Sequence, residues 1–358
     1  MADRQDRDGE STVRSFLAAL DCSIRDLYPG YPAFVMATGI ISNGLYFLEM
    51  FRLSQAFFVI NLVAFPILMA AIVIRLVRHT AALWADLLNP RLVFSFFTIV
   101  AATDVLGMQC DLRGYSDAAV MLWGFALATW LVLLYLSFAV LSFLNSAQDA
   151  NVVHGGWLIA IVGTQSLVLL GVRVADHLVE YSTGLIVLVH MLWGIGLALY
   201  AIFVTLFSYR IFFFKLTPND VSPLLWVVMG AAAISANAGT SLLMNNAHVP
   251  YLTSMKPFID GVTLLVWAWG TWWIPLLMFF GVWKHAICRV PLSYSPALWS
   301  LVFPLGMYSV ATFRFSLAAQ FPFLGYLGRE FIWVAVPAWL VTASAMAVSN
   351  LRSLKRVA

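Results

Sequence analysis

Long apolar stretches separated by short polar segments fill most of this chain. Each stretch is predicted to be a membrane-spanning helix, because a helix needs about 20 apolar residues to cross the hydrocarbon of a bilayer. Ten such stretches cover residues 30–49, 55–77, 92–110, 118–144, 155–174, 184–209, 222–244, 258–282, 296–313 and 331–349. Runs such as Leu131 to Leu136 lack the alternation of apolar and polar positions that barrel strands show. The pattern therefore predicts an all-α polytopic membrane protein.

The polar segments predict one membrane domain with short ends. We expect residues 30–349 to form the ten-helix transmembrane domain, with a cytoplasmic segment at residues 1–29 and a cytoplasmic tail at residues 350–358. Val13 to Leu20 is too short and too interrupted for a signal peptide. Arg14 to Arg25 is either an amphipathic helix on the membrane surface or a solvated lead-in. In the first case one apolar face would carry Phe16, Leu17, Leu20 and Ile24.

The spans repeat in pairs. The odd-numbered spans are shorter than the even-numbered ones, and their midpoints near residues 40, 101, 164, 233 and 304 are separated by roughly 60–70 residues. In each odd span an aromatic residue precedes small residues or a helix breaker: Phe34, Phe97, Trp157, Trp226 and Trp299. Small residues allow close approach of helices or leave space beside them, whereas bulky residues suit the lipid boundary. We therefore expect five helical hairpins with the small-residue helices inside; plain helix packing is the alternative.

Composition narrows the class of protein further. The chain is 62% hydrophobic and 10% charged, far from the composition of soluble domains. Its three cysteines have no metal-ligand spacing, and a net charge of +3 comes without a basic patch interleaved with aromatic residues. Phosphate-binding loops, HExxH and nucleophile elbows are all missing from the sequence. We therefore expect no enzymatic activity, no cofactor, no metal and no nucleic-acid partner.

Basic residues predict the orientation. An even number of spans places both termini on one side, and the opposite side carries six of the 20 Lys and Arg residues: Arg52, Arg113, Arg173, Lys256, Arg314 and Arg329. The remaining fourteen lie on the side of the termini. By the positive-inside rule, the termini are predicted to be cytoplasmic and the protein to lie in the inner (plasma) membrane.

Two short motifs resemble a known family. Tyr31-Pro-Ala-Phe-Val-Met-Ala-Thr-Gly-Ile-Ile-Ser is similar to the first-helix signature of the tellurite-resistance/dicarboxylate transporter family, which includes malate permeases, sulfite exporters and slow anion channels. Trp299-Ser-Leu-Val-Phe-Pro-Leu-Gly resembles the ninth-helix motif of that family. The resemblance extends over the whole chain in span number and hairpin period, but only these two motifs are specific.

The resemblance implies a fold and a gate. It implies five hairpins around a pseudo-fivefold central pore, commonly within a homotrimer whose protomers each have a pore. The pore-blocking phenylalanine of the family falls on Phe303, and Val302 stands where many relatives have Thr. Independently of the family, Pro304 removes a backbone hydrogen bond and kinks the helix, so that the Phe303 ring can project into a lumen and exclude water. The alternative is a Phe that faces lipid or the protein core.

Further residues of the odd spans are candidates for the pore wall and its kinks. Gly39, Gly163, Gly230 and Pro304 lie at comparable depths in their spans, which predicts one ring of bends at the middle of the membrane; ordinary packing glycines are the alternative. The candidate pore-lining set is Phe34, Thr38, Gly39, Ser42, Phe97, Thr103, Gly163, Thr164, Gly230, Ser235 and Gly306. Neutral donors that can replace an anion's hydration shell also include Asn43, Gln165, Asn237, Thr240, Ser309 and Thr312. Interhelical hydrogen bonding is the alternative role for these groups.

Ionisable residues within the spans are costly, so each is a functional candidate. Asp104 has no basic residue one turn away and is predicted either to couple anion movement to a proton or to bond a neighbouring helix. His190 is expected to be satisfied by a backbone carbonyl, and Asp260 to pair with Lys256. Arg314 can attract anions, but snorkelling to the interface is favoured.

These observations together predict an anion channel or permease. The favoured substrates are C4-dicarboxylates such as malate, followed by chloride or nitrate, with sulfite or tellurite export third, a ranking that the family resemblance supplies. A membrane sensor or assembly subunit without transport is the alternative from a different class. The expected partners are small anions, the lipid bilayer and two further copies of the chain.

Overall fold

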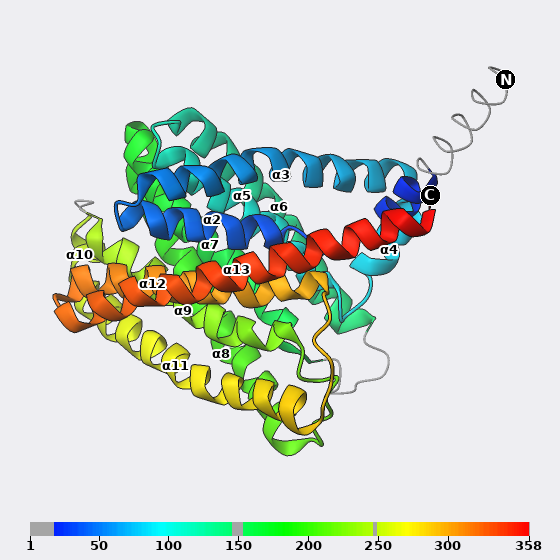
Figure 1. The fold of residues 1–358 in the computed structure, drawn as a ribbon. Helices are drawn as coiled ribbons and strands as arrows, with labels where there is room; N and C mark the ends of the chain where they lie inside the picture. The colour runs from blue at the N-terminus through cyan, green and yellow to red at the C-terminus, as the bar shows by residue number, and fades with distance from the viewer. Residues whose placement is uncertain (1–17, 145–152, 246–248, 358) are drawn as a thin grey trace.

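The structure, a computed structural model, describes residues 18–144, 153–245 and 249–357 (Figure 1). The described residues form helices and connecting turns, which confirms the all-α prediction for a polytopic membrane protein. In this part of the chain, nine helices are long and apolar enough to cross a membrane, and α2 (Ala33–Phe47) is a shorter apolar helix of 15 residues. Because α2 is only about 22 Å long, the count of ten spans stays a prediction.

Five short helices form a closed ring. They are α2, α5 (Phe97–Asp111), α7 (Ile159–His177), α9 (Val227–Met244) and α12 (Trp299–Ala319). Each packs against the next in this order, and α12 packs back against α2. In the spans that contain α5, α7, α9 and α12, 72% to 94% of the most apolar window is buried. These helices therefore form the inner layer of the molecule.

Five longer helices surround the ring. They are α3 (Phe51–Arg78), α6 (Ser116–Phe143), α8 (Ser182–Phe213), α11 (Lys256–Val282) and α13 (Pro322–Val357), and each packs against the ring helix that precedes it (Figure 1). Only 17% to 39% of their most apolar windows is buried. Their exposed Leu, Val and Phe side chains suit a lipid boundary because lipid tails are as apolar as these residues.

The ring helices all run in the same direction, because an outer helix returns the chain after each one. We call the end of the ring where α13 finishes the terminal face, and the opposite end, near α10 (Pro250–Ser254), the far face (Figure 1). Two short elements, α4 (Thr80–Leu87) and the π-turn Trp283–Ile287, lie at the ends of outer helices. A further 3₁₀ turn, Val179–Tyr181, precedes α8.

A single 3₁₀ turn opens each of the last four ring helices. These turns are Val93–Phe96, Gly155–Leu158, Pro223–Trp226 and Pro296–Leu298. At the second turn, His154 accepts a hydrogen bond at Nδ1 from the Gly156 amide (3.0 Å), and its Nε2 lies 2.8 Å from the Arg91 carbonyl oxygen. Burial lowers the pKa of His154 and outweighs the opposing effect of the Arg91 carbonyl. The neutral imidazole therefore caps this helix.

Several predicted spans are shorter than the helices in the structure. The helices α3, α8 and α13 extend beyond their predicted spans at both ends, while α6 and α11 only begin two residues earlier than predicted. The helix α13 runs to Val357 through most of the segment predicted as a tail. The apolar run of a span ends where the helix leaves the hydrocarbon of the bilayer. The backbone hydrogen bonds of the helix continue into polar residues such as Arg75 and Arg78. The predicted spans therefore underestimate these helices.

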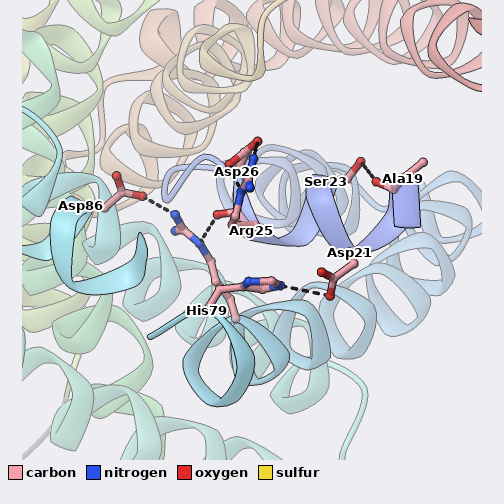
Figure 2. Close-up of polar contacts among 8 residues, drawn as sticks. Ala19, Asp21, Ser23, Arg25, Asp26, His79 and Asp86 are labelled. Atoms are coloured by element: carbon pink, nitrogen blue, oxygen red, sulfur yellow. Dashed lines mark hydrogen bonds and ion pairs between the residues drawn. The ribbon is translucent and has the colours of Figure 1, made fainter. Parts of the chain in front are cut away.

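The beginning of the described chain is fixed to the corner between α3 and α4 (Figure 2). The carboxylate of Asp21 lies 3.1 Å from Nε2 of His79. Arg75 donates from Nε to the Arg25 carbonyl oxygen (2.9 Å) and from Nη2 to the Asp86 carboxylate (2.6 Å). Because the Arg75 side chain is almost fully buried, these bonds replace its lost hydration.

The amphipathic prediction for this segment is only partly described. Residues 18–25 are helical and Leu20 is exposed, while Phe16 and Leu17 lie outside the described residues.

Candidate functional site

Most residues that line the cavities of the ring follow one stripe on each helix, and each stripe is continued here by one residue towards the terminal face. On α12 this stripe is Phe303, Met307, Val310 and Arg314, at intervals of four, three and four residues. Corresponding positions on the other ring helices are Met36, Ile40, Asn43 and Phe47; Ala101, Val105, Met108 and Leu112; Val162, Ser166, Leu169 and Arg173; and Ala233, Asn237, Ser241 and Met244. All but the first residue of each stripe line the cavities described next.

Two cavities occupy the lumen towards the far face. The first, the inner chamber, has a volume of about 30 Å³ and is lined by residues of all five ring helices, including Asp104 and Ser166. The second, the far vestibule, has a volume of about 360 Å³. The two share Phe47, Met108, Leu169 and Arg314 as lining residues, so they adjoin one another.

Arg314 places a positive charge in both cavities. Its Nη1 donates to the Asn237 side-chain oxygen and to the Ser241 hydroxyl oxygen, each at 2.8 Å. Its guanidinium lies 5.4 Å from the centre of the Phe47 ring. Within the described chain no carboxylate lies within 4.0 Å of it. The snorkelling prediction was therefore wrong: Arg314 lines both cavities and bonds to α9, and α12 continues past it to Ala319.

Asp104 lies in the wall of the inner chamber and is 2% exposed. Its Oδ2 accepts a hydrogen bond from the Ser166 hydroxyl on α7 (2.7 Å), which agrees with the predicted bond to a neighbouring helix. Its Oδ1 is buried without a hydrogen-bond partner in the described structure. Asp104 and Arg314 therefore face one chamber without forming an ion pair.

Phe303 lies on the terminal side of the inner chamber. Phe303 precedes Met307 by one turn on the same stripe and is 2% exposed. The corresponding residues on the other helices, Ala101, Val162, Ala233 and Met36, are buried as well. Two of them are alanines, which leave space beside a bulky ring.

A third cavity, the terminal vestibule, lies at the other end of the ring. Its volume is about 520 Å³, and it is lined by residues close to the start of every ring helix: Tyr28, Leu92, Gly155, Leu225 and Pro296. It has no lining residue in common with the inner chamber, and Phe303 lines neither of them. The terminal vestibule and the inner chamber are therefore separate cavities.

Charged groups of the terminal vestibule are partly paired. Arg210 donates from Nη2 to the Asp220 carboxylate (3.0 Å), and the Arg91 side chain is exposed. Burial raises the pKa of Asp220, but hydrogen bonds from Thr217 and the charges of Arg210 and Arg91 outweigh it, so the pKa is lowered.

Arg173, the second cation of the far vestibule, has anionic partners. Its Nε donates to Asp111 Oδ2 (2.7 Å), and His177 Nε2 lies 2.5 Å from Asp111 Oδ1. Asp176 adds a longer contact to the Arg173 guanidinium (3.8 Å). Its charge is therefore largely compensated, unlike that of Arg314.

Three hydroxyls predicted to line the pore instead contact outer helices. Thr38 accepts a hydrogen bond from the Trp339 indole (2.9 Å), and Thr164 accepts one from the Trp130 indole (2.8 Å). Ser42 donates to the Ser54 carbonyl oxygen on α3 (2.7 Å). Indole donors of outer helices need buried acceptors, which the ring hydroxyls supply.

Glycines predicted as kinks mark close packing between helices. A Cβ on Gly39 would lie 2.3 Å from Val105 of α5, one on Gly230 would lie 2.7 Å from Pro304, and one on Gly306 would lie 2.8 Å from Ile40. Gly163 packs against Phe97 in the same way. These contacts correspond to the packing alternative for the small residues.

The remaining candidates lie within the helix layers. Phe34 forms an edge contact with Trp299 at 4.7 Å, between α2 and α12. Thr103 and Ser235 donate to carbonyl oxygens one turn earlier in their own helices, at 2.8 and 2.7 Å.

Two predictions for ionisable residues outside the ring have different outcomes. The His190 prediction is confirmed, since its Nδ1 lies 2.7 Å from the Ile186 carbonyl oxygen on α8. The Asp260 pairing was wrong: the Lys256 ammonium instead donates to the Asn245 carbonyl oxygen (3.1 Å), since α11 begins at Lys256 beside that loop.

Sequence reasoning assigned no role to Ser166, Met108 or Met307, which line the inner chamber. Among the chamber residues, Asn43 and Asn237 were predicted only as members of a larger polar set. The spacing of four, three and four residues from Phe303 could have identified Met307 and Arg314.

Residues 26–347 match the sequence model of a family described as voltage-dependent anion channel. Over 137 residues the chain is 41% identical to an uncharacterized membrane protein of Mycobacterium tuberculosis, which covers 38% of this chain and 69% of that protein.

Two other relatives extend over most of the chain. An uncharacterized transporter of Methanocaldococcus jannaschii is 25% identical over 327 residues, which cover 89% of this chain and 93% of that protein. A sulfite efflux pump of Arthroderma benhamiae is 21% identical over 346 residues, which cover 89% of each chain.

Proposed function

Since this chain belongs to the voltage-dependent anion channel family, we propose that it conducts small anions through the lumen of its five-helix ring, with Phe303 as the gate. The observation that carries this proposal is the charge of Arg314 inside the lumen, held by the neutral partners Asn237 and Ser241. A buried cation without a carboxylate partner favours an anion beside it and repels cations.

The proposal that Phe303 is the gate depends on its position in the ring. The terminal vestibule and the inner chamber are separate cavities, and we place the gate between them. An aromatic ring in a lumen acts as a hydrophobic constriction, and such constrictions stop ions by excluding water. Pro304 follows in the helix interior and removes one backbone hydrogen bond, so α12 can bend where the ring must move.

The proposed substrates are small inorganic oxyanions, with malate retained as a second candidate. The inner chamber of about 30 Å³ suits an ion of a few atoms. A relative that covers 89% of this chain is a sulfite efflux pump, which supports the same class. Malate would fit the far vestibule of about 360 Å³, and that candidate rests on the family resemblance.

The proposal includes a location, an orientation and an assembly. It places the protein in the plasma membrane with the terminal face towards the cytoplasm, since most Lys and Arg residues lie on the side of the termini. It also includes proton-linked transport through Asp104 and a homotrimer with one lumen in each protomer. Native mass spectrometry of the purified protein measures the oligomeric state, and a monomer or dimer would contradict the trimer.

The gate can be tested in planar bilayers with purified wild-type protein and the Phe303→Ala variant. We expect the variant to carry at least tenfold more anion current than the wild type, since a barrier lowered by about 1.4 kcal/mol changes a rate tenfold. Currents are compared in chloride, nitrate, sulfite and malate to rank the ions.

Phe125→Ala is the matched control, because Phe125 is 51% exposed on the outer helix α6. It should leave the current at the wild-type level. A correctly folded Phe303→Ala protein without current in any of the four anions would contradict the proposed gate and favour a non-transporting sensor or assembly subunit.

A further inference from the structure

We propose that the inner chamber selects anions that carry a hydroxyl group, such as hydrogencarbonate or hydrogensulfite, over anions that lack one, such as nitrate or chloride. This inference rests on the proposed function. It concerns which anions the lumen prefers, whereas the proposed function concerns whether anions pass at all.

The first observation is an unused pair of acceptors. Asp104 Oδ1 and Asn43 Oδ1 belong to side chains that are 2% and 3% exposed, and both atoms lack a hydrogen-bond partner in the described structure. Both residues line the inner chamber. A buried acceptor without a donor is unfavourable, so a ligand that supplies a hydroxyl hydrogen is favoured there.

The second observation is the cation that lines the same chamber, Arg314. In the described structure both side-chain hydrogen bonds of Arg314 come from Nη1, which leaves Nε and Nη2 for an oxyanion. Two parallel bonds from a guanidinium match the edge of a planar or pyramidal oxyanion. Arg314 thus recognises negative charge and does not require a hydroxyl.

Asp104 and Arg314 together define the selection. They are the ionisable residues that line the chamber, and they form no ion pair in the described structure. A hydroxyl-bearing anion can bridge them, with its charged oxygens on Arg314 and its hydroxyl donated to Asp104 Oδ1. Nitrate and chloride offer only acceptors, so they would leave Asp104 Oδ1 without a donor.

In this arrangement the proton accompanies the anion as its hydroxyl hydrogen. No covalent bond needs to form or break, since Asp104 only accepts a hydrogen bond from the passing ion. The proton linkage proposed for Asp104 then arises from the protonation state of the substrate.

Hydrogencarbonate and nitrate provide a matched test. Both are planar anions of one charge with three oxygens, and only the first has a hydroxyl. We expect potassium hydrogencarbonate to stabilise the purified wild-type protein against thermal unfolding at about tenfold lower concentration than potassium nitrate, at equal pH and ionic strength. In liposomes containing Phe303→Ala protein, the flux ratio should favour hydrogencarbonate to a similar extent.

In the Asp104→Asn variant, the binding ratio and the flux ratio of hydrogencarbonate to nitrate should both fall to about one. The amide of Asn can direct an N–H donor into the chamber, where it can bond either anion. Asp117→Asn, at an exposed position at the start of α6, is the matched control and should retain the wild-type ratios. If Asp104→Asn does not fold, Asn43→Ala serves as the second variant and should lower the preference about threefold.

The ratio of the nitrate and hydrogencarbonate concentrations that stabilise the wild-type protein tests the inference by itself. It needs no variant and no open gate. A ratio near one, or the lack of measurable binding of hydrogencarbonate, would overturn the inference. Unchanged ratios in a folded Asp104→Asn protein would overturn the role of Asp104. Lack of flux for every anion, with the binding preference intact, would contradict the proposed conduction and leave this selectivity supported.

Discussion

At the scale of single residues, Arg314 differs from the other arginine of the far vestibule. Arg173 is compensated by Asp111 and lies beside Asp176, whereas Arg314 has only neutral partners and an aromatic neighbour. A charge held in place by Asn237 and Ser241 needs no conformational change to receive an anion, and such preorganisation lowers the cost of binding.

We expect Arg314→Gln to reduce the flux of every permeant anion at least tenfold in the Phe303→Ala background, since it removes the charge from the lumen. Arg314→Lys should keep part of the flux because it keeps the charge and loses the planar fork. Liposome flux assays with two anions measure both effects.

Arg78→Gln is a suitable control, because Arg78 is an exposed arginine in the last turn of the outer helix α3. Equal flux in Arg314→Gln and the parent protein would exclude the charge of Arg314 as a contributor to conduction.

At the scale of elements, the two 3₁₀ turns Gly155–Leu158 and Pro223–Trp226 are in close contact at the terminal end of the ring. A Cβ on Gly155 would lie 2.2 Å from the Leu224 carbonyl oxygen, a backbone atom of the turn that precedes α9. Since a backbone atom cannot move like the end of a side chain, Gly155→Ala must displace one of the two turns.

We therefore expect Gly155→Ala to destabilise the protein by about 1–3 kcal/mol and to lower its thermal unfolding midpoint in detergent. Gly124→Ala is the control on α6, where an added Cβ meets nothing within 4 Å. That substitution should leave the midpoint unchanged or raise it, because Ala favours a helix over Gly. Equal midpoints for the two variants would show that the turns tolerate separation.

A second contact between layers explains why some polar residues do not face the lumen. Indole nitrogens of α6, α11 and α13 donate to Thr164, Thr312 and Thr38 of the ring, at 2.8 to 2.9 Å. Each bond satisfies a donor and an acceptor that lie away from water. These hydroxyls thus hold outer helices against the ring.

For the whole molecule, the distribution of basic residues predicts a cytoplasmic terminal face. Cys22 is exposed near this face, beside the residues that contact α3. We expect a membrane-impermeant maleimide to label Cys22 in inside-out vesicles and not in intact cells, measured by a gel shift in a Cys288→Ser background.

The matched control introduces a cysteine at Asp117, an exposed position at the far face, in a Cys22→Ser/Cys288→Ser background. The Asp117→Cys protein should be labelled in intact cells. The reverse labelling pattern would mean that the terminal face lies outside, which would contradict the positive-inside assignment.

The sequence by itself determined the helical class, the hairpin repeat and the identity of the inner helices. Apolar length and small-residue content are properties of each segment alone, and they do not depend on the neighbouring helices. Phe303 with Pro304 was also found from the sequence, because a breaker beside a bulky residue is a local signal. Its role as a gate stays a prediction.

Only the tertiary structure decided which side of each ring helix faces the lumen. These helices are apolar or small on every side, so no amphipathic pattern indicates how each one is rotated about its axis. The rotation is set by contacts between layers, such as those of Thr38 with Trp339 and Gly230 with Pro304. Arg314, Asp104 and Ser166 meet at one chamber because packing fixes that rotation.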